Sequence, residues 1–192
     1  NHSSGKMGYA IAEEMANRGA KVTLVTGPSA LITLHQNITR VDVRSAEEMY
    51  IACTKVFDES DVAVLAAAVA DYRPASYSDQ KVKKKTDEMK IDLVKTGDIA
   101  ASLGKSKKDQ QIIVGFALET ENEEQNAAAK LSKKNFDFIV LNSLNDTGAG
   151  FGHDTNKIRI IDKGNNSKSY ELKSKKQVAI DIVDEIVTHI NH

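Results

Sequence analysis

Two segments of this sequence carry residues suited to holding a phosphate or a nucleoside. The first, Asn1-His-Ser-Ser-Gly-Lys-Met-Gly8, leads straight into an amphipathic helical pattern. Free N–H groups and the dipole at a helix start favour a phosphate, and Ser3, Ser4 and Lys6 add donors. The Gly-Lys pair is not a P-loop, because Met7 stands where Ser or Thr would follow the lysine. The simpler interpretation is a helix start with solvated polar residues.

The second segment, Ala66-Ala-Ala-Val-Ala-Asp-Tyr-Arg73, ends an apolar run typical of a buried strand. Small residues at a strand end let a ligand or a backbone segment come close. Asp71 then lies just past the strand, where a carboxylate can accept a hydrogen bond from a ribose hydroxyl. The structural alternative is a small-residue contact between sheet and helix, with Asp71 capping a turn.

Lysines form two further candidate anion sites. Residues 81–85 contain four lysines and one valine. In a strand, Lys81, Lys83 and Lys85 share one side and repel each other unless an anion joins them, so a basic arm closing over a polyphosphate is one interpretation and a solvated face is the other. Lys130 and Lys134 share a helix face, where they complement the helix dipole and could also hold a nucleotide.

Two other patterns predict neither a dinucleotide site nor a metal site. Residues 147–152 contain a glycine-rich run similar to a dinucleotide fingerprint, but a strand pattern follows it rather than the required helix. The 5 histidines show no metal-binding spacing. We therefore expect a glycine loop at 147–152 and no catalytic metal bound directly by protein side chains.

Composition excludes several classes of protein. The chain has 192 residues, 41% hydrophobic and 28% charged, with a net charge of −1. A balance so near neutral gives no general attraction to nucleic acid or to an anionic membrane, and no apolar run is long enough to span one. The single cysteine, Cys53, rules out an intrachain disulfide and fits a reducing, cytoplasmic compartment.

Helix and strand patterns alternate along the chain, which predicts one α/β domain over residues 1–192 with a doubly wound, mostly parallel sheet. In such a fold, ligands bind beyond the carboxyl ends of the strands. The predicted helices span 6–18, 45–58, 99–103, 120–134 and 175–190. The predicted strands span 21–26, 38–43, 61–68, 111–118 and 136–141, followed by a hairpin of 157–162 with 169–172.

Capping signals support the predicted helix boundaries. Gly19 is placed to end the first helix, and Ser45 with Glu48 forms a capping-box pattern at the start of the second. Thr120 with Glu123 shows the same pattern for the helix over 120–134.

Two irregularities interrupt the alternation. Residues 75–95 are polar and lysine-rich and predict a two-stranded arm, built from 81–84 and 90–94, that is inserted into the domain. The chain also opens on a loop that enters a helix without a preceding strand. Because a doubly wound fold places a strand there, we predict that the first strand lies upstream of Asn1.

In their order along the chain, five segments resemble the bacterial phosphopantothenate–cysteine ligases. They are the opening segment 1–8, the Ala-Ala-Val-Ala-Asp-Tyr segment at 67–72, the Lys-Val-Lys-Lys segment at 81–84, the Val-Gly-Phe-Ala-Leu-Glu-Thr segment at 114–120, and Lys130 with Lys134 and Asn135. The third has valine where the family usually has isoleucine. The resemblance runs through nearly the whole chain.

The resemblance implies a two-step ligation in the pathway to coenzyme A. The carboxylate of 4′-phosphopantothenate attacks the α-phosphate of CTP, which releases pyrophosphate, and the amine of L-cysteine then displaces CMP from the acyl-cytidylate. Mg²⁺ is expected to bind mainly through the nucleotide phosphates. Such chemistry needs positioning and charge neutralisation rather than a nucleophilic side chain, and the sequence offers donors of that kind.

Residue roles also follow from the resemblance. Asn1 is expected to hold the acyl-cytidylate, Lys81 to contact phosphates and assist catalysis, and Ala67 and Ala68 to bring backbone close to the reacting carboxylate. The expected nucleotide contacts are Ser3, Ser4, Leu65, Ala66, Ala67, Asp71, Lys81, Gly97, Asp98, Ile99, Ala100, Phe116, Lys130 and Lys134.

The resemblance further implies a homodimer whose basic flap can act across subunits, and it allows for a flavin-dependent decarboxylase domain upstream in the same polypeptide. Two other functions remain open from the residues alone. One is a nicotinamide-dependent Rossmann oxidoreductase, although no dinucleotide fingerprint with a following helix and no ribose-binding acid at the proper offset is found. The other is a nucleic-acid binder that uses lysines 81–85, which the near-neutral charge and few aromatic residues disfavour.

Overall fold

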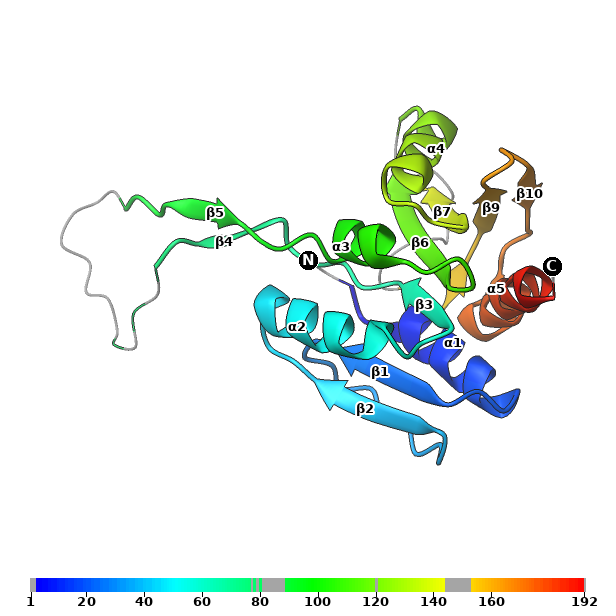
Figure 1. The fold of residues 1–192 in the computed structure, drawn as a ribbon, viewed down its shortest axis with the longest axis horizontal. Helices are drawn as coiled ribbons and strands as arrows, with labels where there is room; N and C mark the ends of the chain where they lie inside the picture. Colours follow the sequence, from blue (N-terminus) through cyan, green and yellow to red (C-terminus); the bar gives the residue numbers. More distant parts are fainter. Residues whose placement is uncertain are drawn as a thin grey trace.

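The computed structural model describes residues 3–76, 78, 80, 89–119, 121–143 and 153–191. Figure 1 shows an α/β body from which one arm extends, formed by β4 (Tyr72–Pro74) and β5 (Leu93–Lys95). No helix in these ranges is both long and apolar enough to cross a membrane.

The main sheet has five strands in the order β10-β9-β7-β6-β3. Its parallel part consists of β3 (Val62–Leu65), β6 (Ile112–Glu119) and β7 (Phe138–Ser143). The antiparallel edge consists of β9 (Ile158–Asp162) and β10 (Ser167–Ser169), which confirms the predicted hairpin with a second strand that begins two residues earlier than expected. The short strands β8 (Thr155–Asn156) and β11 (Lys173–Ser174) pair separately.

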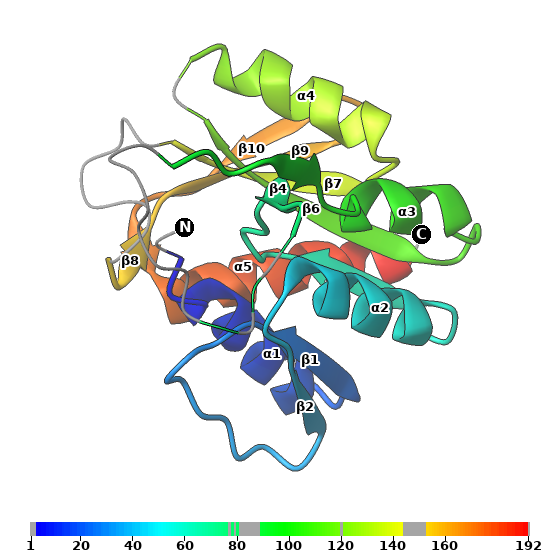
Figure 2. The same ribbon diagram turned by 90° about the vertical axis from the view of Figure 1, so that its left-hand side faces the viewer.

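Helices cover both faces of this sheet, as a doubly wound fold requires (Figure 2). On one face, α1 (Lys6–Asn17) and α5 (Lys175–Ile190) pack on Val114, Phe138 and Val140. On the other, α2 (Ala46–Phe57), α3 (Ile99–Ser106) and α4 (Glu123–Lys133) pack on Ile113 and Ile139. Alternate residues of each central strand enter opposite cores, which explains why these strands are apolar throughout.

Glycine at position 115 is required by the packing of Phe136. An added Cβ at Gly115 would lie 2.0 Å from the Phe136 ring, closer than two non-bonded carbon atoms can approach. Phe136 is 1% exposed and precedes β7, so the missing side chain of β6 makes room for an aromatic ring between strand and helices. The prediction of a strand over 136–141 is therefore shifted, because Phe136 belongs to the turn that enters β7.

Helix ends follow the predicted capping signals in two cases and depart from them in a third. Gly19 ends α1 in the left-handed conformation, at φ 94°. Ser45 accepts the Glu48 N–H at the start of α2, while the Glu48 carboxylate accepts the Arg44 N–H instead of closing the box on Ser45. The predicted box of Thr120 with Glu123 is wrong, because α4 begins only at Glu123.

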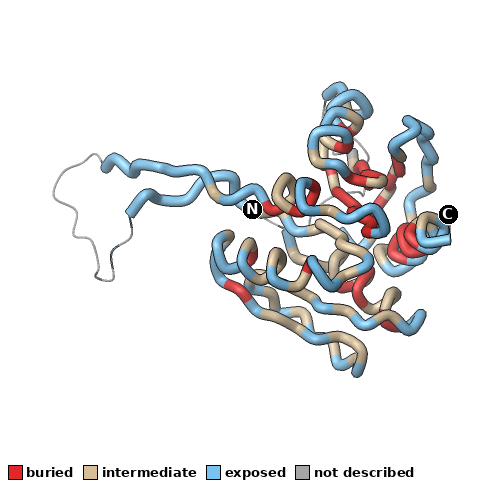
Figure 3. The backbone as a smooth tube through the Cα atoms, in the orientation of Figure 1, coloured by how far each residue is buried: buried red, intermediate tan, exposed pale blue. Residues whose placement is uncertain are grey.

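The arm differs from its prediction. The segment expected over 90–94 contributes β5, but its partner is Tyr72–Pro74, which lies directly after the Ala-rich segment. The other predicted strand, 81–84, lies outside the described residues. The arm is exposed along its length (Figure 3), so hydrogen bonding between β4 and β5 rather than burial defines it.

The remaining strands form a second, two-stranded sheet. β1 (Val22–Thr26) pairs in parallel with β2 (Ile38–Asp42) and with no other strand among the described residues. The predicted doubly wound, mostly parallel α/β fold is confirmed, and within the described part of the chain β1 and β3 each keep one edge without a strand partner. α2 packs on β1 and on α3, and α1 packs on β1 and on α5, so helices hold the two sheets together.

Candidate functional site

The predicted site segments meet beyond the carboxyl end of β3. An added Cβ at Gly8, in the first turn of α1, would lie 3.8 Å from the Ala66 side chain, so the opening loop and the Ala-rich segment are neighbours. The Thr96 N–H donates to the Asp71 carbonyl at 2.9 Å, which places residues 96–98 beside the same segment. These contacts confirm that distant motifs come together at the edge where α/β folds bind ligands.

The start of α1 is suited to an anion. Gly5 adopts φ 78° as the N-cap, and no side chain among the described residues caps this helix. Ser4 lies close, with its Oγ 3.5 Å from the Lys6 nitrogen, and no acidic residue occupies the first turn. By contrast, Ser45, Asp98 and Ser174 cap α2, α3 and α5 with side-chain oxygens. The long hydrogen bond from the Lys6 N–H to Ser4 Oγ is thus the side-chain acceptor contact at the start of α1, and no N-cap side chain among the described residues adds another.

The Ala-rich segment is irregular backbone rather than strand. β3 ends at Leu65, three residues before the predicted end at 68. Ala67 and Asp71 are exposed, while Ala66 and Ala68 are half-buried. The Asp71 backbone is fixed at the base of the arm by Thr96, which leaves an exposed carboxylate at the strand end, as the predicted ribose contact requires.

Lys130 extends from α4 to the Phe116 carbonyl, which accepts a hydrogen bond at 2.8 Å. Leu65, the last residue of β3, pairs with Gly115, so β6 continues past its neighbour and Phe116 lies beyond that pairing. The ammonium group satisfies a backbone acceptor that strand pairing does not. Lys130 and Phe116, both predicted nucleotide contacts, are therefore joined by a hydrogen bond. This bond holds the Lys130 charge beyond the carboxyl end of β3.

Lys134 forms an ion pair with Asp98, and both residues are predicted nucleotide contacts. Asp98 also caps α3 by accepting the Ala101 N–H at 2.9 Å. Burial by itself would raise the pKa of Asp98, but the hydrogen bonds from Lys134 and from the Ala101 N–H outweigh it and lower that pKa. Any phosphate that binds Lys134 must therefore compete with a carboxylate.

The segment 97–100 also has structural reasons for its residues. An added Cβ at Gly97 would lie 2.9 Å from the Tyr50 ring, so only glycine fits there. Ile99 is 8% exposed and belongs to the core between α2 and α3. Of this segment, only the backbone and the Asp98 carboxylate are presented for a ligand.

The two predicted catalytic residues, Asn1 and Lys81, lie outside the described residues, as does the glycine loop at 147–152. The sequence analysis missed Asp154 and Lys175. Asp154 accepts Lys6 Nζ at 2.6 Å, and Lys175 Nζ donates to the His153 carbonyl at 2.5 Å. These residues are far apart in the chain and follow no motif, so no sequence signal predicted their association.

A comparison with known protein families identifies the family of this chain. The family described as "DNA/pantothenate metabolism flavoprotein C-terminal domain" matches residues 1–190. The chain belongs to this family. The nicotinamide-dependent alternative receives no support from that assignment.

Curated relatives agree with the family assignment. The chain is 44% identical over 187 residues to "Coenzyme A biosynthesis bifunctional protein CoaBC" of Haemophilus influenzae, covering 97% of this chain and 46% of that protein. It is 56% identical over 191 residues to "Cysteine/Cysteine sulfinic acid decarboxylase" of an unknown prokaryotic organism, covering 100% and 53%. The chain therefore spans about half the length of the curated relatives it matches.

Solved structures show the same fold. The C-terminal domain of CoaBC superposes with a TM-score of 0.81 at 40% identity, covering 98% of this chain and 86% of that one. A flavoprotein of DNA/pantothenate metabolism from Streptococcus pneumoniae superposes with a TM-score of 0.83 at 21% identity, covering 98% and 90%, which shows the fold alone.

Proposed function

We propose that this chain is a ligase domain that joins L-cysteine to 4′-phosphopantothenate in coenzyme A biosynthesis. The observation that carries the proposal is its similarity, over 98% of its length, to the C-terminal domain of CoaBC at 40% identity. The meeting of the opening loop, the Ala-rich segment and residues 96–98 at one edge of the sheet supports it. A structurally similar protein, a Cab2 variant, is described in complex with phosphopantothenate-cysteine, though at 16% identity.

The chemistry would run in two steps with CTP as the activating nucleotide. The substrate carboxylate attacks the α-phosphate and releases pyrophosphate, and the cysteine amine then attacks the acyl carbon and releases CMP. The described residues offer what such transfer needs, namely the start of α1 and the ammonium groups of Lys130 and Lys134 near developing negative charge. Mg²⁺ would bind through the nucleotide phosphates and neutralise part of their charge.

The relative named as a decarboxylase is compatible with this proposal. This chain covers 53% of it, so we assign decarboxylation to the part of that protein outside the match. A fused, flavin-dependent decarboxylase domain upstream of this chain, within one cytoplasmic polypeptide, would agree with the bifunctional name of the CoaBC relatives.

The split sheet supports a further strand between β1 and β3. Within the described part of the chain, β1 and β3 each have one edge without a strand partner, and α1 and α2 both pack on β1. We propose that residues preceding Asn1 form a parallel strand there. A strand in that position would lead directly into the opening loop and α1, as a strand–helix–strand unit requires.

The apolar arm supports a homodimer. The arm stands away from the body (Figure 1), and its described residues are exposed (Figure 3), apolar ones among them. A second copy of the chain is the proposed partner. Light scattering should give the mass of two chains, and Leu93→Lys should shift it toward one. The exposed residues are Tyr72, Met89, Ile91, Leu93 and Val94.

Pyrophosphate release tests the proposed function. The complete protein is supplied with CTP, Mg²⁺ and 4′-phosphopantothenate, and L-cysteine is added afterwards. We expect pyrophosphate only when nucleotide and acid are both present, and CMP only after cysteine is added. A folded protein that releases no pyrophosphate with any nucleoside triphosphate would refute the ligase.

A further inference from the structure

Two helices end at the edge of the sheet that lies opposite the candidate site. The rings of His189, in the last turn of α5, and of Phe138, the first residue of β7, have centroids 5.1 Å apart. Arg18, the C-cap of α1, forms an ion pair with Asp184 of α5 at 2.7 Å. The ends of both helices therefore lie where the parallel strands begin. This border, the amino edge, comprises residues 18–22, 34–38, 58–62, 108–112 and 187–190.

The loop before β2 reaches the amino edge and carries an exposed leucine there. The Val22 N–H, at the start of β1, donates to the Asn37 carbonyl at 2.8 Å, and the Ile38 N–H donates to the His35 carbonyl at 3.0 Å. Leu34 leads into this turn and is 94% exposed. Because removal of apolar surface from water is favourable, a leucine in this position provides a contact that a partner can cover.

The last turns of α5 add apolar surface to the same edge. Val187 and Ile190 are 39% and 55% exposed, and residues three apart on a helix lie side by side. α1 packs on α5 and on β2 and lies between α5 and the β1–β2 sheet (Figure 1). Leu34 and the end of α5 therefore flank the end of α1, so the exposed apolar side chains belong to one border of the domain.

Two hollows at the amino edge adjoin the strands that have a free edge. One, of about 380 Å³, is lined by residues that include Asp61 and Gln111, which directly precede β3 and β6. The other, of about 240 Å³, is lined by residues that include Lys21, Val22 and Asn37 at the start of β1. Within the described ranges, β1 and β3 each have an edge without a strand partner. A strand placed between β1 and β3 would therefore begin between the two hollows.

The direction of that strand determines where the preceding chain lies. The strand proposed above leads into α1, whose first turn contacts Ala66 beyond the carboxyl end of β3, so it runs parallel to β3 and starts at the amino edge. This chain matches 46% of the CoaBC protein of Haemophilus influenzae, and the similar solved structure of CoaBC is that of a C-terminal domain. A preceding half of comparable length would then join this domain at the amino edge.

We propose that the amino edge is the surface on which the preceding half of the polypeptide docks, with Leu34, Val187 and Ile190 as its apolar contacts. This inference rests on the strand and the fused domain proposed above, and it does not depend on the ligase reaction. The covalent connection keeps the two halves at a high effective concentration, so a small apolar contact is sufficient. The arm begins beyond the carboxyl end of β3, so a second copy bound through the arm leaves the amino edge free.

Maleimide labelling of the complete polypeptide, including the part before Asn1, tests the docking. The variants Ile190→Cys and Ile180→Cys lie on the same helix, and the rate of the half-buried Cys53 is measured in the wild type and subtracted. In this domain Ile190 is the more exposed of the two, at 55% against 41%, so without docking position 190 reacts at least as fast. Docking reverses this order. We expect position 190, and likewise Leu34→Cys, to react about tenfold or more slowly than position 180, since reaction then requires the halves to separate.

Adding Leu93→Lys to each variant separates the preceding half from a second copy as the occupant. Protection that persists when the mass falls to one chain supports the docking, whereas protection lost with the second copy overturns it. The docking is also overturned if position 190 reacts as fast as position 180, or if the complete polypeptide has no preceding half. Pyrophosphate release by the same variants separates this inference from the proposed function. Release without protection leaves the ligase standing and removes the docking surface, whereas protection without release supports the docking and removes the ligase.

Discussion

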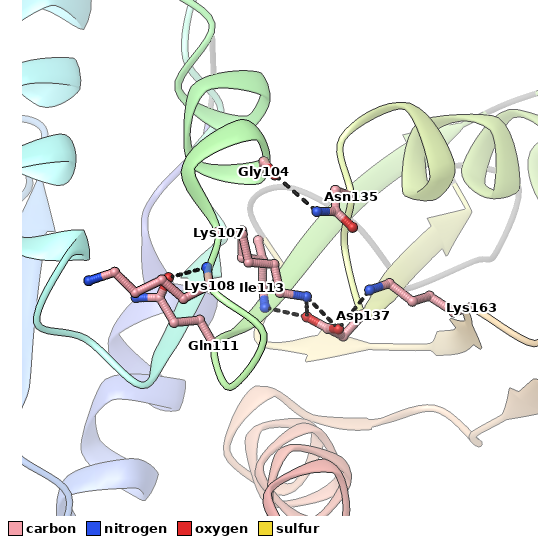
Figure 4. Close-up of polar contacts among 8 residues, drawn as sticks. All are labelled: Gly104, Lys107, Lys108, Gln111, Ile113, Asn135, Asp137 and Lys163. Atoms are coloured by element: carbon pink, nitrogen blue, oxygen red, sulfur yellow. Dashed lines mark hydrogen bonds and ion pairs between the residues drawn. The ribbon is translucent and has the colours of Figure 1, made fainter.

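Replacing Asp137 by asparagine should destabilise the protein strongly, because this carboxylate anchors a half-buried ionic network at the amino end of the parallel strands (Figure 4). Asp137 accepts two hydrogen bonds from Lys107 Nζ, at 2.5 and 2.6 Å, and one from the Ile113 N–H at 2.7 Å. Lys163 is a second cation at this carboxylate, and its Nζ donates to Asp137 at 3.0 Å. The side chains of Lys107 and Asp137 are only 6% and 15% exposed.

The magnitude follows from what the substitution leaves behind. Breaking a buried ion pair by removing one partner costs about 3–5 kcal/mol, because the other charge remains buried without compensation. Asparagine keeps the shape and can still accept the Ile113 N–H, so we expect the lower end, about 3 kcal/mol. For a chain of this size, that corresponds to a fall in melting temperature of about 6–12 °C.

The pH dependence gives an independent check. Burial by itself would raise the pKa of Asp137, but hydrogen bonds from Lys107, from the Ile113 N–H and from Lys163 outweigh it and lower that pKa. A carboxyl whose pKa is lower in the folded than in the unfolded state stabilises the fold at neutral pH. That contribution is lost as pH falls below about 4 and through the folded-state value, so the difference between wild type and Asp137→Asn should shrink over that range.

Thermal unfolding followed by circular dichroism measures both effects. Asp58→Asn is the control, because Asp58 pairs with Lys108 at 3.1 Å but both side chains are more than half exposed, at 77% and 59%. An exposed pair contributes about 0–1 kcal/mol, so this variant should melt close to wild type. Equal melting of wild type and Asp137→Asn at pH 7 would refute the reasoning, as would a difference that does not depend on pH.

Three further predictions address the site and the core. Lys81→Gln should leave the protein folded but slow ligation strongly, and unchanged turnover would remove Lys81 from the mechanism. Asn1→Asp should impair amide formation more than nucleotide binding, because it places a charge beside an anionic intermediate; equal loss of both in binding and turnover assays would indicate a structural role. Gly115→Ala should lower the free energy of unfolding by about 2 kcal/mol or more, since its Cβ would lie 2.0 Å from the Phe136 ring. Gly27→Ala, where nothing lies within 4 Å, is its control in denaturant titrations.

Local pattern predicted most elements because the forces that form them are local. The helix over 175–190 matches α5 at both ends, since Ser174 and Gln177 close a capping box around its first turn. α3 runs to Ser106, three residues past its prediction, because Leu103 and Gly104 are buried against neighbouring segments. The strand predicted to reach residue 68 ends at Leu65, because small apolar residues satisfy a strand pattern whether or not a neighbour pairs with them.

The sequence by itself determined the alternation of helices and strands, the family, and the segments expected to bind nucleotide, since all of these depend on residue order and short spacings. Only the tertiary structure decided what those residues touch. Lys130 binds the Phe116 carbonyl because β6 extends beyond the end of β3. Lys6 forms an ion pair with Asp154, 148 residues further along the chain, because the segment that precedes α5 lies beside the start of α1. Such contacts depend on how the layers pack, and packing brings together residues whose spacing along the chain carries no signal.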